Sequence, residues 1–123
     1  MRDFRKLEVR KDSIQLVVKV YSITRKFPDT EKFELTSQMN RSAISIPSNI
    51  AEGCSRSSTI EFSRFLEIAL GSSFELETKL EIEKLINLIE NETFEKIFTI
   101  LNLLQKRINA MKSSIRKYLN AFL

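Results

Sequence analysis

Apolar residues recur at intervals of three or four along four stretches of the chain, and short polar or proline-containing segments separate these stretches. This spacing places the apolar residues on one face of an α-helix. It predicts four helices, over residues 8–26, 35–52, 59–88 and 92–120, within a single domain of residues 1–123. Four helices joined by short turns favour an all-α protein with the antiparallel up-down-up-down four-helix bundle fold.

Residues with known preferences for helix ends mark these boundaries. Pro28 stops the first helix, because proline disfavours helical geometry in the residue before it. Ser58 and Glu61 form a capping-box pattern at the start of the third helix, and Asn91 is the predicted cap of the fourth. Gly53 fits the position just beyond the second helix, where a left-handed backbone favours glycine.

Three further residues have predicted local roles. Pro47 lies inside the second helix, where it removes one backbone hydrogen bond, and we expect a kink there. Gly71 lies inside the third helix, where glycine is about 1 kcal/mol less favourable than alanine. Close approach of another helix would compensate for that cost; the alternative is that Gly71 is merely tolerated. Cys54 is expected in the loop after Gly53.

The apolar pattern is wider than one bundle core requires. The first helix carries apolar residues on two sides, and in the third helix the pattern shifts after Leu80, so that Glu83 and Lys84 occupy the former core side. Since one core covers only one side of a helix, the surplus predicts burial between the subunits of an oligomer. The predicted oligomer interface comprises Leu16, Val20, Ile23, Phe27, Leu70 and Phe74.

One side of the second helix forms a polar seam, which comprises Gln38, Arg41, Ser45, Asn49 and Glu52. Most of these side chains are uncharged amides or hydroxyls, which bury at lower cost than charges when each finds a hydrogen-bond partner. The seam either faces water or packs against another helix or another subunit. The sequence leaves both interpretations open.

A long motif occupies the second and third helices, and it comprises Arg41-Ser42-Ala43, Ser45 to Gly53, Glu61-Phe62, Phe65 to Ser72 and Glu75-Leu76-Glu77. Upstream positions add Val20-Tyr21, Thr24, Phe27-Pro28, Glu31, Phe33 and Leu35. Together they resemble the four helix bundle protein family, whose members are also called 23S ribosomal RNA intervening-sequence proteins. Glu34 departs from that family, which usually has glycine at this position.

The resemblance implies a four-helix protomer that assembles into a ring-like homopentamer, in a family for which no catalytic activity is established. A related branch, the accessory variability proteins of diversity-generating retroelements, binds nucleic acid and a reverse transcriptase. Nucleic-acid contact is therefore an analogy to test, because a shared fold does not by itself transfer a function.

Composition narrows the chemistry that the chain can perform. The sequence has no histidine, and Cys54 has no second thiol or imidazole with which to form a catalytic dyad or a zinc site. It also lacks a glycine-rich phosphate-binding loop. We therefore predict a protein that is not an enzyme and that holds no cofactor or metal. The start of the chain has no signal-peptide or anchor pattern, which predicts a cytoplasmic protein without a membrane partner.

The net charge of +4 is unevenly distributed. Residues 2–26 carry eight basic and three acidic side chains, residues 91–123 carry six and two, and residues 56–90 carry four and seven. In an up-down-up-down bundle, the start of the first helix and the end of the fourth lie at the same end. The basic residues expected to gather there are Arg2, Arg5, Lys6, Arg10, Lys11, Lys106, Arg107, Lys112, Arg116 and Lys117.

Two functions are compatible with this pattern. In the first, the basic residues contact the phosphates of RNA or DNA, weakly and with little sequence preference. In the second, the protein is a scaffold or adaptor for a protein partner, and the basic residues are simply solvated. The dependence of binding on salt concentration distinguishes the two.

Overall fold

The computed structural model describes residues 3–121, and α-helix accounts for most of them. The four α-helices are α1 (Glu8–Thr24), α2 (Ser37–Cys54), α3 (Thr59–Leu85) and α4 (Asn91–Ala121). Shorter helical turns are η1 (Phe4–Lys6), η2 (Asp29–Glu31) and the π-helical η3 (Lys32–Thr36). No β-strand occurs among residues 3–121. The all-α prediction is confirmed, with boundaries that differ from the predicted ones by only a few residues.

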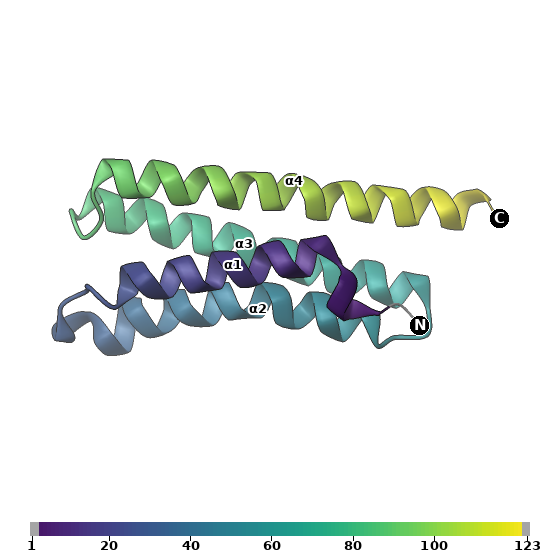
Figure 1. The fold of residues 1–123 in the computed structure, drawn as a ribbon, viewed down its shortest axis with the longest axis horizontal. Helices are drawn as coiled ribbons and strands as arrows, with labels where there is room; N and C mark the ends of the chain where they lie inside the picture. The colour runs from purple at the N-terminus through teal and green to yellow at the C-terminus, as the bar shows by residue number, and fades with distance from the viewer. Residues whose placement is uncertain (1–2, 122–123) are drawn as a thin grey trace.

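The four helices lie side by side along the long axis of the molecule (Figure 1). The α1–α2 and α3–α4 connections lie at one end, and the α2–α3 connection lies at the other. Helix α2 packs against α1 and α3, and α4 packs against α3 and α1. This arrangement brings the start of α1 and the end of α4 to the same end of the molecule (Figure 1).

The structure confirms one of the predicted helix ends and contradicts another. The Ser58 hydroxyl accepts a hydrogen bond from the Glu61 N–H at 3.0 Å, which confirms Ser58 as the N-cap of α3. Helix α2 continues through Pro47 to Cys54. The predictions for Gly53 and Cys54 are wrong, because both residues lie inside α2 and are buried.

Packing against α3 explains why glycine stands at position 53. A Cβ atom added to Gly53 would lie 2.8 Å from both Phe62 Cδ1 and Phe65 Cβ. The close helix approach that was predicted at Gly71 therefore occurs at Gly53. A Cβ atom added to Gly71 would meet nothing within 4 Å, and Gly71 is exposed.

The hydrophobic core runs between the helices and draws on all four of them. Its fully buried members include Leu16, Val20, Met39, Ile46, Ile50, Phe62, Leu66, Leu76, Leu80, Leu101 and Ile108. Burying a side chain of this size stabilises the fold by about 1.5–3 kcal/mol relative to leaving it in water. These residues fix the positions of the surface groups described below.

The interface prediction is wrong for three of its six residues. Leu16 and Val20 are 0 % exposed within the protomer, and Phe27 is also buried. Spacing alone could not rank the two apolar sides of α1, and packing against α2 and α4 selects the side that carries Leu16 and Val20. Val18 of α1 remains 59 % exposed.

Candidate nucleic-acid interface

The start of the described chain holds two arginines against one aromatic ring. The Asp3 carboxylate accepts a hydrogen bond from the Arg5 N–H at 3.1 Å and caps the η1 turn. The Cζ atoms of Arg5 and Arg10 lie 4.5 and 4.9 Å from the centroid of the Phe4 ring. Cation–π attraction at these distances favours both positions. Two guanidinium charges are thereby held together at the start of α1.

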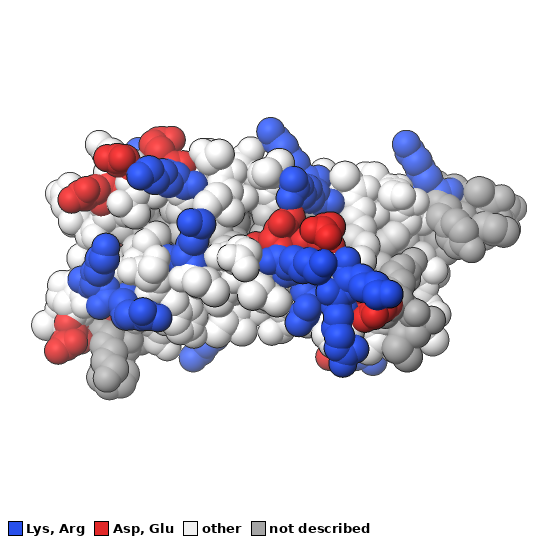
Figure 2. All heavy atoms as spheres, viewed as in Figure 1, with Lys and Arg blue, Asp and Glu red and all other residues white. Residues whose placement is uncertain are grey.

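Two lysines extend this basic group, which we call the α1 basic cluster: Arg5, Lys6, Arg10 and Lys11. Lys11 Nζ lies 3.5 Å from the Glu8 carboxylate. Lys6 is exposed and has no acidic partner within 4 Å in the described part of the chain. Figure 2 shows Lys and Arg side chains gathered over the start of α1, with acidic side chains beside them.

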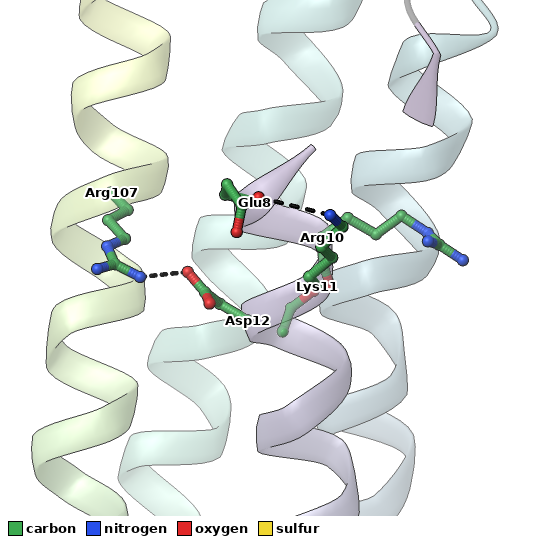
Figure 3. A network of polar contacts seen from close by, with 6 residues as sticks. Glu8, Arg10, Lys11, Asp12 and Arg107 are labelled. Carbon is green, nitrogen blue, oxygen red and sulfur yellow. Dashed lines mark hydrogen bonds and ion pairs between the residues drawn. The ribbon is translucent and has the colours of Figure 1, made fainter. Parts of the chain in front are cut away.

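Arg107 joins α4 to the start of α1. Its guanidinium group donates a hydrogen bond to the Asp12 carboxylate and forms an ion pair with it (Figure 3). The Arg10 side chain extends away from this pair. Arg107 therefore links two helices, while its charge is largely neutralised by Asp12.

The other described basic residues of α4 do not join the α1 basic cluster. Lys112 Nζ and Arg116 Nη2 lie 3.3 and 3.7 Å from the same Glu67 carboxylate of α3. Lys106 lines a hollow between α3 and α4 that also contains Phe74. The sequence predicted one basic cluster at the shared end, whereas the structure divides these residues between the α1 side and the α3 side of α4. Lys117 is exposed, and Arg2 lies outside the described residues.

The polar seam of α2 is also divided. Ser45 Oγ lies 2.7 Å from Ser72 Oγ of α3, and Asn49 Nδ2 donates to Ser45 O and Oγ at 2.7 and 2.9 Å. The middle of the seam therefore packs against α3. Gln38 and Arg41 are exposed, and Glu52 forms a 2.7 Å ion pair with Arg56 on the surface. These three residues fit the water-facing interpretation.

The remaining interface candidates lie at or near the surface. Ile23 and Leu70 are half-buried against the core, and Phe74 is 51 % exposed. Five further large apolar side chains are exposed along α3 and its C-cap. Together with Phe74 we call them the α3 outer face: Ile60, Ile68, Phe74, Ile82, Leu85 and Ile86. The shift of the apolar pattern after Leu80 was the available signal for its distal part.

Glu83 is the unexpected member of the interior. It occupies the core side of α3, its side chain is fully buried, and neither carboxylate oxygen has a hydrogen-bond partner among the described residues. Burial raises the pKa of the Glu83 carboxyl from 4.5 to about 8, and the positive charge of Lys79 opposes this rise in part. The sequence had placed Glu83 on the core side without indicating that it stays there.

The described residues contain neither a metal-binding cluster nor a membrane-spanning helix. No group of three or more Cys, Asp or Glu side chains there is placed to hold a metal ion. None of the described helices combines the length and the apolar character that crossing a membrane requires.

The fold and these surfaces define a four-helix, all-α protein with a basic cluster at the start of α1 and an apolar outer face on α3. Residues 5–110 match the model of the 23S rRNA-intervening sequence protein family, and the chain belongs to that family.

A solved structure supports the same assignment. It is the crystal structure of a protein with unknown function from the S23 ribosomal protein family of Bacteroides thetaiotaomicron. The two chains are 26 % identical, the match covers 85 % of this chain and 97 % of the other, and the TM-score is 0.79. A search among curated proteins returned no match.

Proposed function

We propose that this protein is a non-enzymatic, up-down-up-down helical bundle that binds nucleic acid weakly, and with little sequence preference, through the α1 basic cluster. The observation that carries the proposal is the pair of guanidinium groups held over the Phe4 ring. Because the ring fixes both groups, less side-chain entropy is lost when a phosphate binds between or beside them. Lys6 adds an exposed cation within the same short segment.

The geometry favours backbone contacts over base recognition. Phe4 is already covered by two guanidinium groups, so its ring is not available as a free platform for a base. Arginine and lysine contacts to phosphates position a nucleic acid without reading its sequence. The family description refers to 23S rRNA, which makes RNA the first probe to test.

We further propose that the protein works as a homo-oligomer in which the α3 outer face is buried between subunits. The resemblance described above favours a pentamer. Exposed apolar patches on soluble proteins commonly mark interaction sites. In a cyclic assembly, the α1 basic cluster would recur once per subunit. Several weak phosphate sites would then act together on one nucleic acid.

The second candidate function is a scaffold or adaptor that binds a protein partner in the cytoplasm. The α3 outer face supports it, because its exposed side chains include Leu85 at 78 % and Ile60 at 62 %. In that case the partner, and not a second copy, covers these residues, and the α1 basic cluster remains solvated.

Fluorescence anisotropy with labelled RNA and DNA oligomers of unrelated sequence tests the nucleic-acid proposal. We expect binding that weakens steeply with salt, and equal weakening for all sequences in the variant Lys6→Glu/Arg10→Glu. The matched control is Arg25→Glu/Lys26→Glu, which reverses two exposed charges at the other end of α1 and should retain more of the binding. Equal losses in the two variants, or no binding at low salt, would favour the scaffold function.

A further inference from the structure

Glu83 holds a buried carboxyl that the proposed function does not use. Its two oxygens lack a hydrogen-bond partner among residues 3–121, and the side chain is 0 % exposed. Buried polar groups in proteins are nearly always paired, so an unpaired one needs a physical explanation. The backbone around Glu83 supplies one.

Glu83 anchors the motif that ends α3. The Leu88 N–H donates to the Glu83 carbonyl at 2.8 Å, and the Asn87 N–H donates to the Lys84 carbonyl at 3.1 Å. Asn87 has a φ of 65°, a left-handed conformation that asparagine tolerates better than most residues. Together these features form a Schellman motif, in which the residue at the position of Glu83 commonly makes an apolar contact with the residue at the position of Leu88. The side chain of Glu83 therefore occupies a place suited to a neutral group.

The charged groups of α3 near Glu83 are engaged elsewhere. Lys79, one turn earlier, donates from Nζ to Ser42 Oγ of α2 at 2.6 Å and lies 3.9 Å from the Glu75 carboxylate. Lys84 Nζ lies over the Phe94 ring of α4, 4.5 Å from its centroid. Neither ammonium group is hydrogen-bonded to the Glu83 carboxyl.

Among the described residues, the helices packed against α3 form no ion pair with Glu83. On α4, Glu92 and Lys96 form an ion pair of 3.2 Å at the surface, and Glu95 is exposed. On α2, Arg41 lines a groove that faces α1. An ionised Glu83 would thus have only the partial attraction of Lys79 to offset its burial, and it would also meet the negative end of the α3 dipole.

We propose that Glu83 is a proton-controlled latch on the α3–α4 turn, closed while its carboxyl is neutral and opened when that carboxyl releases its proton to water. The released charge is stable only in solvent, and the side chain reaches solvent if the last turn of α3 unwinds. Unwinding breaks the hydrogen bonds that Leu88 and Ile89 donate to the Glu83 carbonyl. The buried side chain of Ile89 then leaves the core.

The raised pKa of Glu83 places this transition within an accessible pH range. With a value of 4.5 in the open turn and about 8 in the closed one, opening releases one proton between these limits. The opening equilibrium then rises about tenfold per pH unit.

Native-state hydrogen exchange of the Ile86, Asn87 and Leu88 amides, corrected for intrinsic rates, tests the latch at pH 5.5 and pH 7.5. We expect opening of the turn to rise about hundredfold in the wild-type protein and to change little in Glu83→Gln. Glu81→Gln, an exposed site on the same helix, is the matched control and should behave like the wild type. Core amides in α1 should remain more strongly protected than these three amides at both pH values, because the turn opens while the rest of the fold stays intact.

Two results would overturn the latch. An opening free energy for the Ile86, Asn87 and Leu88 amides that equals the free energy of global unfolding at both pH values would mean that Glu83 acts only on global unfolding. A wild-type carboxyl carbon of Glu83 that titrates near 4.5 by NMR would mean that it is not held neutral. The second measurement needs no variant, so it decides the question even if Glu83→Gln folds poorly.

Discussion

Helices α1 and α3 both carry more apolar residues than one helix side requires, but the two surpluses have different fates. In α1, Leu16 and Val20 are buried in the core, whereas the side chain of Val18 is exposed to water. In α3, a full buried side coexists with an exposed outer face that extends from Ile60 to Ile86. A second apolar stripe on a helix therefore predicts extra burial without telling whether the protomer or a partner provides it.

The largest expected effect is a loss of stability, and it distinguishes apolar residues buried in the protomer core from those buried between subunits. Leu16→Ala should lower the free energy of unfolding by about 2–5 kcal/mol, because it leaves a cavity in the core. Phe74→Asp, on the α3 outer face, should leave the helical circular dichroism signal nearly unchanged and reduce the native mass from several times 14.3 kDa to that of a monomer. Denaturant unfolding and light scattering measure the two effects.

The same pair of variants can contradict the assembly proposal. If the wild-type protein is already a stable monomer at micromolar concentration, the α3 outer face does not bury itself between copies. If Leu16→Ala reduces the mass and retains full stability, the assignment of Leu16 to the protomer core is wrong.

Helical spacing and capping preferences were sufficient to predict the four helices, and the Ser58 cap shows how local that information is. The positions of the basic residues could not be predicted from helical spacing alone. Arg107 and Lys106 are adjacent in sequence, yet one pairs with Asp12 of α1 and the other lies beside Phe74 near α3. The packing of all four helices determines which side of α4 faces α1 and which side faces α3. Counting charges along the chain does not reveal this orientation. Gly53 and Gly71 were misassigned for the same reason.

The second prediction concerns the interior of α3 and follows from the pKa of Glu83. Because the folded-state pKa of about 8 exceeds the ordinary value of 4.5, the folded protein binds the proton more tightly than the unfolded chain does. The free energy of unfolding should therefore fall as pH rises between these values, by up to about 1.4 kcal/mol per pH unit, and then level off.

Glu83→Gln removes the titrating carboxyl and should flatten the dependence of the free energy of unfolding on pH. The difference in stability between the variant and the wild type should therefore be more favourable to the variant at pH 8 than at pH 5. Urea unfolding at several pH values measures the difference. A wild-type stability that rises between pH 5 and pH 8, with the same profile in Glu83→Gln, would show that Glu83 is ionised in the folded protein.

The smallest effect contrasts the two glycines, one on the packed side of α2 and one on the open side of α3. Gly53→Ala places a methyl group 2.8 Å from Phe62 Cδ1 and Phe65 Cβ. Overpacking of this kind costs about 1–3 kcal/mol, which offsets or exceeds the gain of about 1 kcal/mol from better helix propensity. Gly71→Ala meets no atom within 4 Å, so it should keep that gain and raise the melting temperature.

Whether Gly71→Ala raises or lowers stability also shows whether α3, unlike α1, packs against a second subunit. Gly71 lies on the exposed side of α3, where a second subunit would approach in the proposed oligomer. In a protomer kept monomeric by Phe74→Asp, Gly71→Ala should stabilise the fold by about 1 kcal/mol. If the same substitution destabilises the wild-type assembly but not the monomer, another helix packs closely over Gly71. Stabilisation in both backgrounds would instead mean that subunits, where they meet on α3, leave space at this residue.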